Sequence, residues 1–382
     1  MYTIKQIFTS VNYTNILNSI QEFFSKDYFN HIKDSVFKSI NCKNFDFARI
    51  EYLCPHCGSR ACKPVTCKTK FCPCCSKIYT ENWANKLNQQ MINQKHKHLL
   101  FTIPKELRSF FLNNRELLTS ISDSLNAVFK DHFWKKYKIT HFGYITFFHT
   151  FGRKSNFNPH LHLLITCGGF KESLQWKSVD FFPYLPFKNS WKYIVTTALK
   201  EAFPHDQKLL NIINSIWKNQ IDFFIDVKGT EIYNSLNALK YLGRYLARPP
   251  LAEYRITHFD GNSVTFWYEQ LPEKNKVFLE LPVEKFIKQL VAHIPPKGFK
   301  MIRRYGIYSR NFSQELKNLI KLKHLKKQKA ITKLTWAERI EKWLGINPLK
   351  CLQCGSNMIL TIFFHKKYGI FDFRLKKKIK IF

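Results

Sequence analysis

The sequence predicts an α+β protein that carries a separate cysteine-rich metal-binding module. Three observations favour this class. Strand-like and helix-like segments interleave after residue 96, and a polar loop joins two apolar runs at 144–152 and 160–166, as in a hairpin. Seven of the 11 cysteines lie between Cys54 and Cys75, where little apolar sequence is available to build a core.

Length and charge limit the possible partners. The 382 residues suffice for two or three domains, and the apolar content of 45% argues against general disorder. Lys and Arg total 61 against 27 for Asp and Glu, which gives a formal net charge of +34. Such an excess favours a polyanionic partner, with nucleic acid ahead of an anionic membrane surface. A compositional bias towards Lys, Asn, Ile and Phe accounts for part of the excess of lysine.

The compartment can be inferred from segments that the sequence lacks. No run approaches the ~18 apolar residues that a membrane span requires, and the first residues lack a charged start followed by an apolar stretch. We therefore expect a cytoplasmic protein without a membrane partner. The clustered cysteines fit metal ligation in a reducing compartment better than a disulfide framework.

Periodicity places the elements in chain order. Residues 13–40 have helical spacing, and proline ends the helix predicted at 233–250. The other predictions are a strand at 98–104, a helix at 106–129, strands at 144–152 and 160–166, a helix at 191–203, and a hairpin at 256–270 around Asp260-Gly261. Shifts in pattern divide the chain into a helical entry with a cysteine module (1–95), a central domain (96–310) and a basic C-terminal region with a C-x-x-C pair (311–382).

Two C-x-x-C pairs predict a zinc site. Cys54 with Cys57 and Cys72 with Cys75 have the separation of a four-thiolate site, in which each turn grips one ion through two sulfurs. Cys67 is a reserve ligand, and Cys62, Cys74 and His56 are surplus. The pair Cys351 and Cys354 offers half a site, which is either a structural remnant or a ligand pair completed elsewhere.

Histidines on the predicted hairpin form a second candidate metal site. His160 and His162 stand two residues apart, so a strand directs both imidazoles to one face and Leu161 to the other. His149 lies on the preceding strand, and the loop between the strands could fold it opposite His160. Three imidazoles could then share one divalent ion. Such a site would hold Mn, Co, Ni or Zn more firmly than Mg, although cellular supply could make Mg the working ion.

Two tyrosines stand one helical turn apart in the segment 233–250. Tyr241 and Tyr245 would lie on one face, about 6 Å apart, where core packing is the simplest explanation. Arg244 and Arg248 flank them, either as phosphate ligands or as a solvated cationic face.

With these residues identified, the chain resembles a known family, the two-tyrosine HUH transposases of rolling-circle insertion sequences, called the insertion-sequence-91 family. The resemblance extends from about Cys54 to Met358 and no single motif carries it. Besides the cysteine module, its segments are "HLLFTIPKELR", "HTFGRKSNFNPHLHLLITCGG", "YLGRYLARPPLAEYRI", "VAHIPPKGFKMIRRYGIYSR" and "WAERIEKWLGINPLKCLQCGSNM".

The resemblance implies the antiparallel sheet with packed helices of HUH endonucleases. It implies that His160, His162 and a third ligand, which we assign to His149, hold Mg or Mn. It also implies that Tyr241 and Tyr245 are the nucleophiles that nick single-stranded DNA, leaving a 5'-phosphotyrosine and a free 3'-hydroxyl. The zinc module would help to recognise transposon ends. The candidate DNA contacts are Arg244, Arg248, Arg303 and Arg304.

Two other functions stay open at this point. One is a non-catalytic DNA-binding protein that keeps the zinc module and the basic surface, and the other is a replication initiator or relaxase with similar chemistry. The intact histidine pair and both tyrosines favour an enzyme over the first, and the lack of a GxxxxGK[ST] motif disfavours the second. An aromatic content of 16% would suit base stacking on a single strand.

Overall fold

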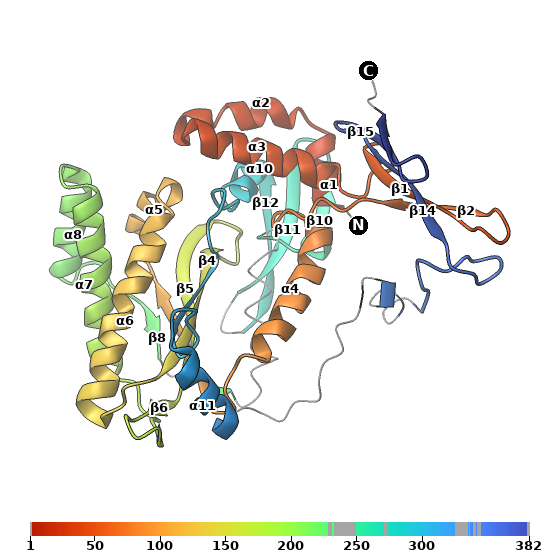
Figure 1. The fold of residues 1–382 in the computed structure, drawn as a ribbon. Helices are drawn as coiled ribbons and strands as arrows, with labels where there is room; N and C mark the ends of the chain where they lie inside the picture. The colour runs from red at the N-terminus through yellow and green to blue at the C-terminus, as the bar shows by residue number, and fades with distance from the viewer. Residues whose placement is uncertain are drawn as a thin grey trace.

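The centre of the protein is an antiparallel sheet of six strands (Figure 1). The computed structural model describes residues 2–227, 231–232, 250–270, 273–324, 335, 337–338, 341 and 345–379. In order across the sheet the strands are β13 (Ile302–Gly306), β4 (Gly143–Phe151), β5 (Phe157–Thr166), β3 (His96–Thr102) and β8 (Ile225–Asp226), with β9 (Glu231–Ile232) paired to β3. The expected antiparallel sheet and its strands at 98–104, 144–152 and 160–166 are thus confirmed.

Three long helices cover one face of this sheet: α6 (Glu116–Tyr137), α7 (Tyr184–Ala202) and α8 (Gln207–Trp217). Alternate residues of β5, such as Leu161 and Leu163, join their apolar side chains in one core cluster. Trp191 of α7 is fully buried there, and its indole N–H donates to the carbonyl of Thr102 at 2.7 Å. Apolar side chains at alternate positions of the strands therefore pack against the helices. The side chains between them point to the opposite face of the sheet.

The continuous helix predicted at 106–129 is wrong. A 3-10 turn (Lys105–Leu107) and the short helix α5 (Phe110–Asn113) precede α6. Asn114 has φ −115° and ψ 63°, outside the helical region, and its side-chain amide donates to the carbonyl of Phe110 at 3.1 Å. Asparagine commonly ends a helix in this way, because its side chain competes for backbone hydrogen bonds.

Two further helices pack on the opposite face, α4 (Pro73–Asn88) and α11 (Gln314–His324). Leu87 of α4 and Ile320 of α11 join one cluster with Phe147 and Leu164 of the sheet. Trp83 of α4 meets Phe147 edge to face, with ring centroids 5.7 Å apart. A helix from the cysteine-rich segment is thereby fixed against the central sheet.

The N-terminal helices pack on a separate three-stranded sheet. Its strands are β10 (Ile256–Phe259), β11 (Ser263–Gln270) and β12 (Asn275–Pro282), so the predicted hairpin around Asp260-Gly261 is confirmed. The helices against it are α1 (Ile4–Thr9), α2 (Tyr13–Asn18), α3 (Lys26–Ile40) and α10 (Val283–Val291), with a 3-10 turn at Gln21–Phe23. One apolar cluster joins these elements, and it includes Ile32 and Phe286.

A five-stranded sheet is built from both ends of the chain (Figure 1). In order across the sheet, its strands are β16 (Lys377–Ile379), β15 (Gly369–Asp372), β14 (Ile359–His365), β1 (Ala48–Leu53) and β2 (Arg60–Pro64). A small ribbon of β6 (Gly168–Phe170) and β7 (Trp176–Ser178) completes the strands of the described residues. Strands from before residue 95 therefore pair with strands from after residue 310. The division of the chain into domains at residues 95 and 310 stays a prediction. In the described part of the chain, no helix is long and apolar enough to cross a membrane.

Candidate functional site

Three histidines meet on the face of the central sheet that does not carry the large helical core. In the β4–β5 register His149 lies opposite His160, and Phe147 lies opposite His162. The ligand nitrogens of the three histidines all lie within 4.8 Å of one another. Their ring centroids are 4.1 to 5.2 Å apart. The structure therefore brings His149, His160 and His162 together, and strand alternation is the reason.

Hydrogen bonds orient two of these rings. Nδ1 of His160 lies 2.6 Å from the carbonyl oxygen of Asn158, an arrangement in which Nδ1–H donates and Nε2 keeps its lone pair. Nδ1 of His162 lies 2.7 Å from Nε2 of His98, and these two rings stack with centroids 4.9 Å apart. Outer partners of this kind fix the tautomer and the ring plane of metal-binding histidines.

The surroundings keep two of these three imidazoles uncharged. Burial lowers the pKa of His160 to about 4 and lowers that of His162 well below its usual range. The guanidinium of Arg108, held by a 3.0 Å hydrogen bond from Nε to the Ile103 carbonyl, contributes to the lowering of the His160 pKa. Neutral imidazoles are the form that binds metal ions, so this donor set suits a divalent cation.

His98 is a member of the site that the sequence reasoning missed. It lies on β3, and its register partner on β5 is Leu164, two residues along the strand from His162. The segment "HKHLLF" has a histidine at alternate positions, which signals a shared face but does not say which strand lies next to it. Strand order, which pairs β3 with β5, decides the contact.

Four of the predicted site residues lie outside the described residues. These are Tyr241, Tyr245, Arg244 and Arg248. Their roles therefore rest on the sequence alone.

The single four-cysteine site predicted from Cys54, Cys57, Cys72 and Cys75 needs correction. The structure separates its two halves, and each half joins a different pair of cysteines. Cys72 and Cys75 gather with Cys42 and Cys67, and the other group is Cys54, Cys57, Cys351 and Cys354. The cause is the strand pairing, because the turn that holds Cys54 and Cys57 lies in the five-stranded sheet, beside the C-terminal strands.

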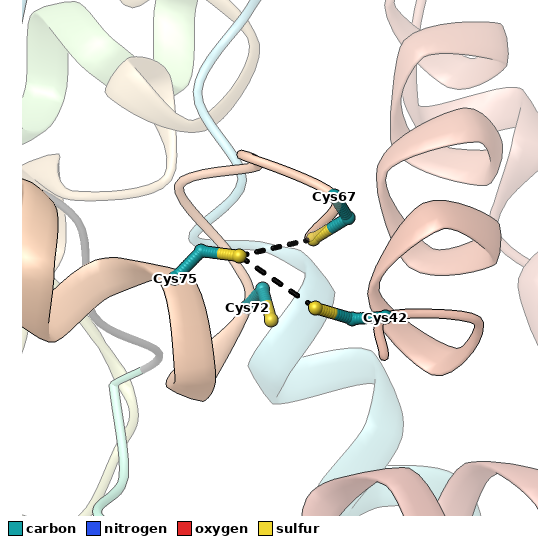
Figure 2. A group of neighbouring side chains, drawn as sticks. All are labelled: Cys42, Cys67, Cys72 and Cys75. Atoms are coloured by element: carbon teal, nitrogen blue, oxygen red, sulfur yellow. Dashed lines mark hydrogen bonds between the residues drawn. The ribbon is translucent and has the colours of Figure 1, made fainter. Parts of the chain in front are cut away.

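The first cysteine group joins α3 to the start of α4. Figure 2 shows Cys42 just after α3, Cys67 in the loop before α4, and Cys72 and Cys75 at the beginning of α4. Sγ of Cys75 lies 3.6 Å from that of Cys42 and 3.7 Å from that of Cys67. Four sulfurs around zinc at about 2.3 Å would be about 3.8 Å apart. The reserve ligand Cys67 thus belongs to the group, and Cys42 is a member that no spacing rule had marked.

The positions of these thiols favour a cation. Cys72 is the N-cap of α4 and Cys75 is in its first turn, where the positive end of the helix dipole stabilises thiolates. Hydrogen bonds from Cys42 and Cys67 lower the pKa of Cys72, while contacts with Cys67 and Cys72 raise that of Cys42. A negative charge shared by crowded sulfurs is the charge that a divalent ion would neutralise.

A basic cavity of about 940 Å³ opens between α4, β13 and α11. None of the described residues that line it is acidic, and seven are basic: Lys70, Lys86, Lys300, Arg303, Arg304, Arg310 and Lys317. Tyr79, Trp83 and Phe312 add aromatic rings. Arg303 and Arg304, two of the four candidate arginines, contribute to the lining. Arg303 lies opposite Thr146 on the face that α6 covers, and it pairs with Asp123 of α6 at 3.0 Å, so its guanidinium points away from the cavity. Arg304 donates to the side chain of Gln90 at 2.6 Å.

The cavity and the histidines share one face of the sheet. Ile302, which lines the cavity, lies opposite Phe147, and Phe147 lies opposite His162 on the next strand. Directly opposed residues of an antiparallel sheet point to the same face, and neighbouring strands lie about 4.8 Å apart. The edge of the cavity is therefore separated from the histidine strand by roughly 10 Å.

Comparisons with known proteins agree with this site. Residues 143–343, more than half of the chain, match the family described as "Putative transposase". Residues 15–103 match the family described as "Transposase zinc-binding domain", which is of the insertion-sequence-91 type. A cluster of three histidines on an antiparallel sheet, a cysteine module and these matches together define a transposase.

Two similar proteins indicate which kind of transposase this is. The chain is 28% identical over 340 residues to the "Transposase for insertion sequence element IS801" of Pseudomonas savastanoi pv. phaseolicola, an alignment that covers 85% of this chain and 79% of that protein. It is 21% identical over 339 residues to the "Putative transposase y4qJ" of Sinorhizobium fredii, with coverages of 81% and 83%. No solved structure matches the chain. The chain belongs to the insertion-sequence-91 family of transposases, as its sequence motifs predicted.

Proposed function

We propose that this protein is a rolling-circle transposase that nicks single-stranded DNA and transfers the strand through a covalent 5'-phosphotyrosine. The observation that carries the proposal is the convergence of His149, His160 and His162 on one sheet face, in a chain of a transposase family. Clustered neutral imidazoles beside a basic cavity suit phosphate chemistry on DNA better than a purely structural role.

Mg or Mn is the ion that we expect at the histidines. The donor set fits, because burial keeps the imidazoles of His160 and His162 neutral and the hydrogen bond from His160 to Asn158 directs Nε2 away from the backbone. When bound, such an ion polarises a phosphoryl oxygen of the scissile phosphodiester. The chain's own contribution is to hold the three rings and to place the Arg108 cation beside His160.

Tyr241 and Tyr245, which lie outside the described residues, are the proposed nucleophiles. The phenolic oxygen of one tyrosine would form a bond to phosphorus as the bond from phosphorus to the 3' oxygen breaks. The phenol loses its proton, and the leaving 3' oxygen gains one to become a free hydroxyl. The second tyrosine would then serve the next cleavage, so that the strand is exchanged without ATP.

The basic cavity supports single-stranded DNA as the substrate. Its lysines and arginines could follow the phosphates, and half-exposed Tyr79 with Trp83 could stack on bases. It shares a sheet face with the histidines, roughly 10 Å away across the strands. A strand of a few nucleotides held there could reach the metal site. Such a substrate would place the protein in the cytoplasm.

The cysteine module is proposed to bind zinc through Cys42, Cys67, Cys72 and Cys75 and to help recognise the transposon ends. Support comes from the zinc-binding family match and from the contact of α4 with the sheet through Trp83 and Phe147. Unchanged binding of end DNA by a zinc-depleted Cys72→Ser variant would count against the recognition role.

A covalent adduct is the direct test. The protein is incubated with an end-labelled single-stranded oligonucleotide that carries a transposon end, with Mn²⁺ or Mg²⁺, and the mixture is resolved on a denaturing gel. We expect a labelled band at the mass of the protein plus DNA. The Tyr241→Phe, Tyr245→Phe double variant should lose this band, whereas Tyr254→Phe, a change to an exposed tyrosine outside the site, should keep it.

The controls separate this proposal from a DNA-binding protein without catalysis. An undiminished adduct in the double variant would refute the tyrosine assignment. Binding of the oligonucleotide without an adduct, at any concentration of Mn²⁺ or Mg²⁺, would favour the non-catalytic alternative. Equal cleavage of the matched duplex would refute the single-strand specificity.

A further inference from the structure

The chain contains the same six-residue pattern at two distant places. Residues 54–59 read "CPHCGS" and residues 351–356 read "CLQCGS", so each has two cysteines followed by Gly-Ser. The first lies between β1 and β2, and the second lies just before β14. The zinc-binding family match ends at residue 103 and does not extend to the second pattern.

Both patterns fold into the same turn. In the first, the amide of Gly58 donates to the carbonyl of Cys54 at 3.0 Å, and in the second Gly355 donates to Cys351 at 2.9 Å. Each glycine is in the left-handed region, with φ of 74° and 72°, where a side chain would be strained. The amides of both leading cysteines donate to the serine carbonyls at 2.8 Å. This turn directs both of its sulfurs to one side.

The pairing of β1 with β14 brings the two turns face to face. Leu53 lies opposite Ile359 in the register of these strands, which places the two turns at the same end of the sheet. Sγ of Cys54 lies 3.5 Å from Sγ of Cys354, and Sγ of Cys57 lies 3.6 Å from Sγ of Cys351. All four sulfurs lie within 4.8 Å of one another.

These distances suit a metal ion better than disulfides. A disulfide requires about 2.0 Å between sulfurs, whereas a tetrahedral zinc site requires about 3.8 Å. Cys54 and Cys351 are buried and Cys57 and Cys354 are exposed, so an ion would sit at the edge of the protein with one cysteine of each turn beneath it.

We propose that Cys54, Cys57, Cys351 and Cys354 form a second structural zinc site, which binds the C-terminal strands to the N-terminal module. This goes beyond the transposase activity and does not depend on it. Among the described residues, the apolar cluster at this place has three buried members, Cys54, Cys351 and Met358, with Tyr52 and Ala61 packed on it. So small a core needs the ion, and metal binding there is folding free energy.

Zinc stoichiometry tests the proposal on the full chain. Purified protein should contain two zinc ions per chain, and the Cys351→Ser, Cys354→Ser variant should contain one. The Cys42→Ser, Cys67→Ser variant should also contain one, because it removes the other site. A matched control, Cys62→Ser, changes an exposed cysteine of neither group and should keep two. One ion in the unchanged protein, or two in the Cys351→Ser, Cys354→Ser variant, would overturn the proposal.

Three measurements keep the test decisive if a variant fails to fold. In the unchanged protein, titration with Co²⁺ should raise the thiolate charge-transfer absorbance until two equivalents are bound, and saturation at one would refute the second site. Cys354→His exchanges one zinc ligand type for another at an exposed position, so it should retain two ions, whereas Cys354→Ala should retain one. Loss of free thiols to disulfides between these cysteines in protein purified without oxidant would also refute it.

Discussion

Two groups of potential metal ligands form in different ways: the histidine cluster, and the Cys54 group, which consists of Cys54, Cys57, Cys351 and Cys354. His149, His160 and His162 lie within 14 residues on two neighbouring strands, and one hairpin register brings them together. The Cys54 group joins cysteines that are 294 residues apart, Cys57 and Cys351, through strands from both ends of the chain. The first arrangement follows from local periodicity, whereas the second depends on which strands become neighbours.

The two groups also differ in whether a bound metal ion would serve the reaction or the stability of the fold. The histidines lie in a sheet that is already held by a large apolar core, so a metal ion bound there would be available for chemistry. The cysteine groups lie where the apolar core is small or where separate helices meet, so a metal ion bound there would contribute to folding.

The largest effect should come from removing a zinc ligand. Cys72→Ala should release one zinc ion and unfold the module around α4, because a structural zinc ion contributes on the order of 10 kcal/mol. Zinc analysis and thermal unfolding followed by circular dichroism measure this. The control is Cys167→Ala, which truncates a buried cysteine of neither group, and it should keep all zinc. Normal zinc content in the Cys72 variant would show that the group of Cys42, Cys67, Cys72 and Cys75 is not a zinc site.

Removing a histidine ligand should affect the reaction and leave the fold intact. His160→Ala should slow adduct formation by on the order of 10³-fold, since the metal ion contributes several kcal/mol and each 1.4 kcal/mol is tenfold. Its thermal unfolding should stay close to that of the unchanged protein. EDTA should slow the unchanged protein similarly and have little further effect on the variant. An unaltered rate in His160→Ala, judged against the exposed control His205→Ala, would contradict the assignment.

The outer histidine should have an intermediate effect. His98→Ala removes the partner of His162 Nδ1 and should weaken the metal affinity by about 10- to 100-fold. The Mn²⁺ dependence of adduct formation should shift to higher concentration while the rate at saturation changes little. His98→Gln, which can still offer a hydrogen bond, should recover part of the affinity. A lower saturated rate with an unchanged Mn²⁺ midpoint would exclude this positioning role.

The cavity lysines should affect binding of the strand. Lys86→Ala with Lys317→Ala should lower the affinity for single-stranded DNA and reduce the slope of log K against log salt by roughly 0.7 for each phosphate that the variant no longer neutralises. Fluorescence anisotropy at several salt concentrations measures both quantities. The matched control changes Lys200 and Lys208 to Ala, exposed residues of α7 and α8 on the other face of the sheet. An equal decrease in the control would indicate attraction by net charge alone.

A buried histidine outside the metal cluster should respond to acid. Nδ1 of His293 lies 3.1 Å from the Thr150 hydroxyl, its Nε2–H donates to the Ser155 carbonyl, and burial, with a contribution from Arg115, lowers its pKa to about 3. Between about pH 6.5 and pH 3 the unfolded chain binds this proton and the folded protein does not, so stability falls with acid by about 1.4 kcal/mol per pH unit.

The comparison with His293→Gln isolates this effect. Chemical unfolding at pH 7.0, 6.0 and 5.0 should give a shallower dependence of the unfolding free energy in the variant. Equal slopes in the two proteins would show that His293 does not titrate with the expected shift.

The elements that periodicity predicted well are those whose pattern repeats over a long segment. The strands β3, β4 and β5 lie close to their predicted ranges, because their alternate apolar residues had one core to face. The helix α7 ends one residue before its predicted end, but it begins at Tyr184, seven residues before the predicted start. The prediction failed at 106–129, where Asn114 ends α5 by a single side-chain hydrogen bond. A single local hydrogen bond of that kind does not change the periodicity of apolar residues from which the helix was predicted.

The same distinction separates the site residues. The chain by itself determined that the protein belongs to the insertion-sequence-91 transposases, that His149, His160 and His162 share one sheet face, and that cysteines supply metal ligands. Tertiary structure alone decided which cysteines meet, that His98 contacts His162, and that seven basic residues surround one cavity. The physical reason is that spacing along a strand or a turn fixes the direction of neighbouring side chains, whereas the partner of a distant strand is chosen by the packing of the whole fold.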